Sequence, residues 1–294
     1  LIDGQRAGSV SAGGASLQYL NVEQIERIEV LRGSRSAIYG ADAIGGVVQI
    51  FTRRGETSGV NPYLRIAGGS QGTWERSLGV SGGDQQTRYS LNGSLEETAG
   101  IDHTGKSWDS DADHDAYRNK AFSLNLSHQF NDIFAARQAV SYFEADSSRY
   151  LSSVANFFAY NNNGEIIFER NATRNVGKSE ILRAQGDLVA TKKWFDNDLG
   201  ATVLVGYDIG RSDSWNTTST AQMEAFNINS PVYGQPFRTP MTKTVDNTGK
   251  GGNFGYFANA QISGFDDRIV LTGGMRRDQG KASWTRNNFT NVYN

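Results

Sequence analysis

Apolar and polar residues alternate along most of the chain beyond residue 60, and this period of two predicts β-strands with two different faces. In the clearest segment, 198–211, Val203, Val205 and Tyr207 share one face while Asp208 lies on the other. Nine segments show the pattern: 62–69, 74–82, 88–97, 120–130, 133–145, 179–190, 198–211, 253–263 and 268–278. We therefore expect a mostly β protein with nine antiparallel strands.

The connections between these segments alternate in length. Long connections follow the third, fifth and seventh segments, at about 98–118, 146–178 and 212–252, and all the other connections are short, including the first. Short turns at one end and long loops at the other are typical of outer-membrane barrels. Such barrels close with an even number of strands in bacteria, so nine strands predict a partial barrel. The chain also begins with Leu1 rather than Met, and we expect a piece of a longer protein.

The first 57 residues have a different pattern, with short β-branched runs separated by glycines. Residues 22–27 are interpreted as helical, and residues 28–31 and 44–51 as strands, which predicts a small mixed α/β unit. The expected division is one unit at 1–57 and a second, all-β unit at 58–294.

The composition excludes several functions. A net charge of −2 gives no electrostatic footprint for nucleic acid. The absence of cysteine removes disulfides, thiolate metal sites and thiol nucleophiles. No apolar run approaches the 18 residues of a membrane-spanning helix. Without a recognisable nucleophile motif, an enzyme is not expected.

Three stretches near the N-terminus carry a resemblance to a known family. They are LIDG at 1–4, IERIEVLRG at 25–33 and SAIYGADAIGGVVQI at 36–50, and together they resemble the C-terminal part of the plug of TonB-dependent receptors. Ser34 departs from the family, which usually has proline after Arg-Gly. The plug most resembles that of vitamin B12 receptors, whereas FNINSPVYG at 226–234 is more similar to ferric-siderophore receptors.

The resemblance implies a 22-stranded barrel filled by a plug, in the outer membrane of a Gram-negative bacterium. Residues 1–57 are then the C-terminal part of the plug domain, and residues 58–294 are the N-terminal part of the barrel. The implied function is import of a scarce metal chelate, either a ferric siderophore or cobalamin. The implied partners are TonB, with ExbB and ExbD, which pulls on the plug, and outer-membrane lipid. No cofactor is required.

Several plug residues are candidates for a functional or structural role. Arg27, Arg32 and Arg35 are expected to pair with acidic residues that line the barrel, although ordinary solvated charges are the alternative. Four glycines are expected to serve tight turns and close packing: Gly33, Gly40, Gly45 and Gly46.

The long connections hold the candidate ligand-binding residues. Exposed aromatic side chains suit a large planar ligand, and the alternative is that they pack on each other to order the loops. The candidates are Tyr150, Phe157, Phe158, Tyr160, Trp215, Phe226 and Tyr233.

An acidic run in the first long connection is a candidate calcium site. Alternate aspartates supply the hard oxygen ligands that Ca²⁺ prefers, and vitamin B12 receptors, which this chain resembles, have an aspartate-rich calcium loop there. A solvated, like-charged loop is the alternative. The candidate ligands are Asp102, Asp109, Asp111, Asp113 and Asp115.

Two other classes of outer-membrane protein compete with the receptor. A passive porin and a barrel-embedded enzyme would both have the strand pattern, but both lack a plug, so residues 25–50 favour the receptor.

Overall fold

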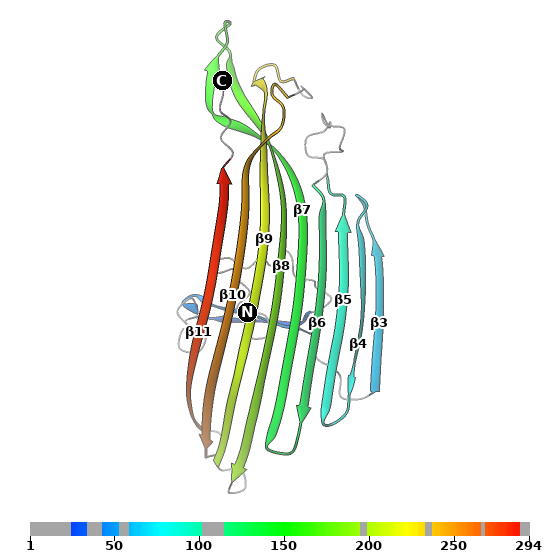
Figure 1. Cartoon of the computed structure of the whole chain (residues 1–294), viewed down its shortest axis with the longest axis vertical. Coiled ribbons are helices and arrows are strands. Elements are labelled where there is room, and N and C mark those ends of the chain that lie inside the picture. Colours follow the sequence, from blue (N-terminus) through cyan, green and yellow to red (C-terminus); the bar gives the residue numbers. More distant parts are fainter. Residues whose placement is uncertain are drawn as a thin grey trace.

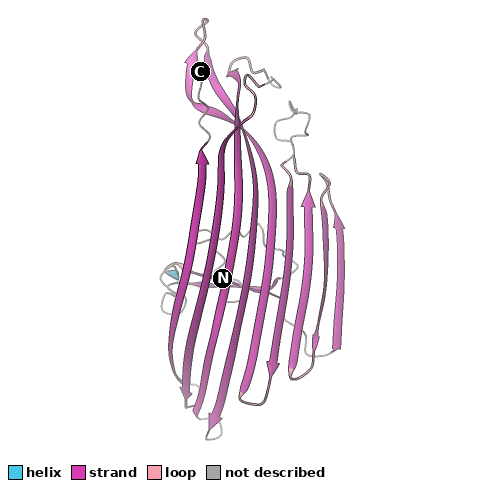
Figure 2. Cartoon of the chain, viewed as in Figure 1, coloured by secondary structure: helices cyan, strands magenta, loops and turns pink. Residues whose placement is uncertain are grey.

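A computed structural model describes residues 25–33, 43–52, 59–101, 115–194, 199–232, 237–265 and 268–288. Apart from a single 3-10 helical residue, Ala43, the regular elements within these ranges are antiparallel strands, as Figure 2 shows. None of the described residues forms a helix long and apolar enough to cross a membrane.

The N-terminal part of the described chain forms a two-stranded sheet of β1 (Ile25–Arg32) and β2 (Gly46–Thr52). In the view of Figure 1 this hairpin crosses behind the long strands. The helix expected at 22–27 is wrong for its described part, because residues 25–27 begin β1. Six residues are too few for a helix that is stable without packing partners, whereas in β1 Val30 pairs with Val48 across the ladder.

The rest of the chain forms one sheet of nine strands, in the order β11-β10-β9-β8-β7-β6-β5-β4-β3, so each strand pairs with its neighbours in sequence. Figure 1 shows the strands side by side, joined in a simple up-and-down meander. All nine expected segments are confirmed as strands, and the partial barrel wall is confirmed with them. The bounds are β3 (Gly59–Gly68), β4 (Trp74–Gly83), β5 (Thr87–Thr98), β6 (Tyr117–Gln129), β7 (Phe134–Tyr160), β8 (Ile166–Trp194), β9 (Leu199–Asn227), β10 (Thr242–Gly264) and β11 (Ile269–Asn288).

Two of the long connections, 146–178 and 212–252, were predicted wrongly, because most of their residues are strand. The expected break between β5 and β6 is confirmed, since β5 ends at Thr98 and β6 begins at Tyr117. The β7–β8 ladder continues beyond Ser147↔Gly177 to Tyr160↔Ile166, and β9 continues to Asn227. Strands pair through backbone hydrogen bonds, whatever their side chains are. Apolar and polar side chains alternate only where one face of the sheet meets an apolar medium. The sequence pattern therefore ends where the apolar face ends, well before the strands do.

The two faces of the long sheet have opposite chemistry. On one face, which we call the apolar face, Leu188, Val205 and Tyr256 are exposed at 54%, 45% and 47%. On the other, the polar face, Ser90 and Asn92 are buried. A water-soluble sheet buries its apolar face, so this inverted arrangement is that of a barrel wall in lipid with a filled, polar interior.

The height of the apolar band matches a bilayer. On β9 the apolar face is uncharged from Leu199 to Ile209, and Arg211 is its first charged residue. At about 3.3 Å per residue and a tilt of about 40°, this stretch is about 25 Å tall, the height of the apolar band in outer-membrane barrels.

The turn between β4 and β5 is stabilised by the Asp84 side chain and by the backbone conformation of Gly83. The Asp84 carboxylate accepts hydrogen bonds from the N–H groups of Thr87, at 2.6 Å, and Gln86, at 2.8 Å, and these bonds lower the pKa of Asp84. Gly83 has φ +152°, and a Cβ there would lie 2.1 Å from the Thr87 carbonyl oxygen.

We expect Gly83→Ala to destabilise the barrel by about 1–3 kcal/mol, because alanine is strained at this φ and clashes with main chain. Gly93 is the matched control, because a Cβ there meets nothing within 4 Å. Gly93→Ala should be neutral or slightly stabilising. Urea unfolding of both variants in detergent, followed by tryptophan fluorescence, measures the difference. Equal stabilities would contradict the role assigned to Gly83.

Candidate functional site

A charged network crosses the polar face from β7 to β11. Its first part is the ion pair between Arg137 on β7 and Asp187 on β8, with 2.7 Å between Nε and Oδ1. The two residues face each other directly in the ladder, and opposite charges in that position stabilise a sheet. The Asp187 side chain is only 7% exposed.

The second part of the network is centred on Arg276 of β11. Its Nη2 lies 2.6 Å from a carboxylate oxygen of Asp208 on β9 and 2.6 Å from one of Asp278 on β11. Gly255 on β10 stands between the two aspartates in the same row of the ladder. A Cβ on Gly255 would lie 2.5–2.8 Å from all three side chains, so the glycine makes room for the arginine to reach across β10.

Phe257 lies between the two parts. It faces Gly206 in the ladder, next to Asp187, and the guanidinium of Arg276 lies 5.5 Å from its ring centroid. The network therefore runs across five adjacent strands. It contains no nucleophile paired with a base. Its arginine and aspartate side chains make this face of the sheet a surface that can form ion pairs and hydrogen bonds.

The wall is also polar on the early strands. Asn92 donates hydrogen bonds from Nδ2 to the hydroxyls of Ser90, at 2.8 Å, and Ser123, at 3.3 Å, and all three residues are buried. Nearby, Arg65 of β3 forms an ion pair with Glu75 of β4. The hydrogen bonds among Ser90, Asn92 and Ser123 offset the cost of removing these buried polar groups from water.

The candidate plug arginines lie in different environments. Arg27 is on β1 and pairs within the plug, with Glu29 at 2.8 Å and Glu26 at 3.3 Å, and its guanidinium lies 3.8 Å from the Phe51 ring centroid. Arg32 is the last residue of β1, and Arg35 lies outside the described residues. Pairing of these arginines with the barrel stays a prediction.

Two of the four candidate plug glycines have the backbone that favours glycine. Gly33 has φ +83° and Gly46 has φ +140°, at the facing ends of β1 and β2. Gly45 precedes β2, and Gly40 lies outside the described residues.

Two of the candidate ligand-binding aromatics lie on the same side of the strands as the apolar face, above the apolar band. Tyr150 on β7 is buried, with the Arg174 guanidinium 5.2 Å from its ring centroid. Trp215 on β9 donates its Nε1–H to Asp246 at 2.9 Å. A hydrogen bond from Lys243 to Asp246, and then the bond from Trp215, lower the pKa of the Asp246 carboxyl.

Two other candidate aromatics, Tyr160 and Phe226, lie near the ends of β7 and β9. Phe226, near the end of β9, has the Arg170 guanidinium 5.2 Å from its ring centroid. Tyr160 ends β7 and is exposed. Phe157 and Phe158 are residues of β7, and Tyr233 lies outside the described residues. Ligand binding by the candidate aromatics stays a prediction.

Most of the candidate calcium ligands lie outside the described residues: Asp102, Asp109, Asp111 and Asp113. Asp115 is described, and its Oδ1 accepts the backbone N–H of Tyr150 at 2.8 Å. Among the described residues, no group of three or more His, Cys, Asp or Glu side chains is placed to hold a metal ion. Calcium binding stays a prediction.

The sequence interpretation missed the charged network of β7 to β11. A signal was present, since Arg137, Asp187, Asp208 and Arg276 all occupy the polar phase of their strands. Finding the pairs also needs the register between strands, because Asp187 and Arg137 are 50 residues apart.

Two comparisons with known proteins agree on one class. Residues 1–47 match the family model of the TonB-dependent Receptor Plug Domain. The solved structure of the ferric-catecholate import receptor Fiu from E. coli K12, in its open form, superposes with a TM-score of 0.61 at 17% identity, covering 96% of this chain and 53% of Fiu. Its closed form gives a TM-score of 0.63 at 17% identity, covering 89% and 46%.

BauA, the ferric preacinetobactin receptor from Acinetobacter baumannii, gives a TM-score of 0.56 at 14% identity, covering 90% of this chain and 48% of BauA. At such identities the likeness concerns the fold, and the chain spans about half the length of these receptors. The resemblance found in the sequence is thus confirmed, and the expectation of a protein other than an enzyme agrees with these matches, all of them receptors.

Proposed function

We propose that this chain, which joins the plug sequence of TonB-dependent receptors to part of their barrel fold, belongs to a receptor that imports a scarce metal chelate across a Gram-negative outer membrane. The observation that carries the proposal is a plug-family match at residues 1–47 followed by a sheet with an exposed apolar face and a buried polar face. A passive porin needs the sheet but has no use for the plug.

The proposed cargo is a ferric siderophore, with cobalamin as the second candidate. Two similar structures are named as ferric-catecholate and ferric preacinetobactin receptors, which favours the siderophore. The cobalamin alternative rests on the resemblance of residues 32–47 to vitamin B12 receptors.

In the proposed mechanism, TonB, energised with ExbB and ExbD, pulls the plug away from the polar face. Arg32 and Arg35 would share carboxylates such as Asp208, which already binds Arg276 on the wall. A carboxylate has enough acceptor positions for two arginines. When the plug arginine leaves, the wall arginine still neutralises the carboxylate, so the release leaves no uncompensated buried charge.

Growth of a strain that lacks the gene for the intact receptor tests the proposal. With a ferric siderophore as sole iron source, or cobalamin as sole source of that vitamin, the restored gene should support growth on one of the two. Deleting TonB should abolish that growth. Uptake that persists without TonB would indicate a passive pore and contradict the proposal.

A further inference from the structure

An arginine lies on the polar face of the extended strands. Arg149 of β7 faces Asn175 of β8 in the ladder, and Asn175 faces Thr218 of β9. The alternation that places Arg137 on the polar face places Arg149 there too. The row lies beyond Arg211, the first charged residue past the apolar band on β9. Figure 1 shows β7, β8 and β9 continuing beyond the ends of β3 to β6, so this part of the polar face lies outside the hydrocarbon layer.

The positive charge of Arg149 has no ion-pair partner. The residue is exposed, and within the described part of the chain its guanidinium forms no ion pair and no hydrogen bond. The rows of the polar face from Ala145 to Leu151 contain no aspartate or glutamate on β7, β8 or β9. Asp115, which precedes β6, accepts the backbone N–H of Tyr150 at 2.8 Å with its carboxylate. The guanidinium therefore keeps its donors for a ligand.

Two amide side chains present further donors in this region. Thr218 donates its hydroxyl to Oδ1 of Asn175 at 2.8 Å, which leaves the Nδ2 group of Asn175 to donate. In the next row Asn216 faces Gly177. A Cβ on Gly177 would lie 3.3 Å from Nδ2 of Asn216 and 3.8 Å from Oγ of Ser147. The missing side chain of the glycine thus leaves room between two polar groups.

The polar groups around Gly177 are mainly hydrogen-bond donors. We call Arg149, Ser147, Asn175 and Asn216 the donor group. All four side chains can donate hydrogen bonds, and only the arginine carries a charge. A guanidinium presents two parallel N–H groups, which match the two oxygens of a carboxylate. The donor group is therefore complementary to a carboxylate.

We propose that the donor group binds a free carboxylate of the imported chelate. The inference deepens the proposed function and rests on it, because it names a chemical class of cargo: metal chelates that keep at least one carboxylate outside the metal's coordination shell. β7 and β8 hold the cation and β9 holds an amide, so the three extended strands form the subsite together.

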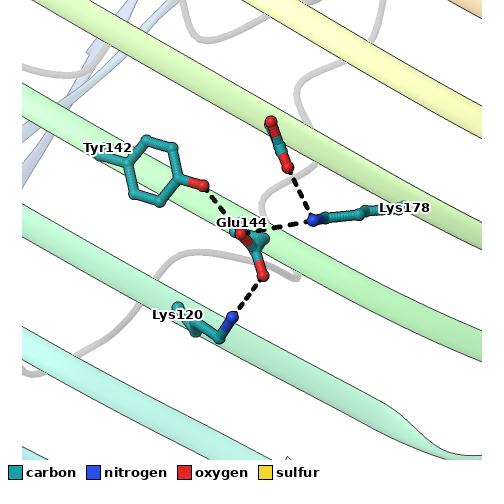
Figure 3. Close-up of polar contacts among 5 residues, drawn as sticks. Lys120, Tyr142, Glu144 and Lys178 are labelled. Carbon is teal, nitrogen blue, oxygen red and sulfur yellow. Dashed lines mark hydrogen bonds and ion pairs between the residues drawn. The ribbon is translucent and has the colours of Figure 1, made fainter.

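The opposite face of the same strands provides a contrasting case. Lys178, the neighbour of Gly177 on β8, forms ion pairs with Glu180 at 2.7 Å and with Glu144 at 3.5 Å. Figure 3 shows that Lys120 also binds the Glu144 carboxylate. These lysines are already neutralised. Lys178 is therefore a matched control, since it is a cation beside the donor group in sequence but on the other face.

Isothermal titration calorimetry of the intact receptor in neutral detergent tests the proposal. Ferric citrate is the probe, because this chelate keeps free carboxylates, and a neutral ferric trihydroxamate without carboxylates is the reference. Arg149→Gln should weaken binding of ferric citrate about tenfold to a hundredfold, the range for a hydrogen bond to a charged group. It should not change binding of the reference. Arg149→Lys should give an intermediate loss, because lysine keeps the charge but not the planar fork.

Two further variants separate the subsite from general effects on folding. Gly177→Asp places a carboxylate of the chain itself beside the donors, and only the flexible end of Asn216 has to move. It should weaken binding of ferric citrate at least about tenfold, because the new carboxylate competes for the same hydrogen bonds. Lys178→Gln should bind ferric citrate as the wild type does. Heat-dependent migration on a denaturing gel shows that each variant is folded.

Wild-type affinity for ferric citrate in Arg149→Gln or Gly177→Asp would overturn the proposal, and so would an equal loss in Lys178→Gln. It would also fail if the wild type did not bind ferric citrate at millimolar concentration, or if an equal concentration of inorganic phosphate displaced the chelate completely. TonB-dependent growth on a siderophore despite such failures would leave the proposed function intact. Uptake without TonB would instead refute the proposed function, whatever the calorimetry shows.

Discussion

Replacing Val205 with arginine is expected to destabilise the folded barrel by about 2–4 kcal/mol, the cost of a lipid-facing cation near the midplane of a bilayer. Val205 lies on the apolar face of β9 and is 45% exposed. The neighbouring residue, Leu204, lies on the polar face, opposite Val189 of β8 and Asn259 of β10, and does not face hydrocarbon. Leu204→Arg should therefore cost much less.

The two substitutions introduce the same side chain at adjacent positions. The difference between their losses in unfolding free energy therefore reports which face of the sheet meets lipid. Unfolding in urea from lipid vesicles gives the two free energies, and heat-dependent migration on a denaturing gel shows whether each barrel folds. If Leu204→Arg proved as damaging as Val205→Arg, the assignment of the apolar face to lipid would be wrong.

The substitution Arg137→Met is expected to destabilise the barrel by about 2 kcal/mol, because it leaves the buried carboxylate of Asp187 without its partner. Removing one member of a fully buried ion pair costs about 3–5 kcal/mol, but the Arg137 side chain is 42% exposed and water screens part of the interaction. The double variant Arg137→Met/Asp187→Asn removes both charges and should recover most of the loss.

A double-mutant cycle in the intact receptor measures this coupling. Asp187→Asn alone should cost less than Arg137→Met, since the arginine left behind still reaches solvent. Additive effects of the two substitutions would show that the ion pair does not couple β7 to β8. The Arg137–Asp187 pair would then not belong to the charged network.

Strand positions could be predicted from the sequence because lipid on one side and polar contacts on the other give a strict period of two. Residues 198–211 show this most clearly. The same logic explains the failure at 146–178, where neither face meets hydrocarbon and polar residues such as Ser147, Ser148 and Asn175 occur on both sides of the ladder. Helical spacing at 22–27 was misleading because strand pairing between β1 and β2 overrides a weak local preference.

The charged network was harder to predict than the strands. Which face Asp208 occupies follows from alternation alone. Its contact with Arg276 depends on the register of β9, β10 and β11 and on the missing side chain at Gly255. Register is set by turns and by the whole hydrophobic pattern, and a pair separated by 68 residues leaves no local signal.

The continuation of β7, β8 and β9 far beyond the apolar band constrains how the mouth of this protein can evolve. A flexible loop tolerates insertions of any length, but one extra residue in a paired strand turns every following side chain to the opposite face. Unless a β-bulge absorbs the extra residue, as the ladders of β7, β8 and β9 do in places, lengthening these strands without inverting them requires residues added two at a time, in both partners of a hairpin. Variation in these extended strands should therefore arise by substitution along them, and by growth at the tip around Asn161 to Glu165, where the chain reverses.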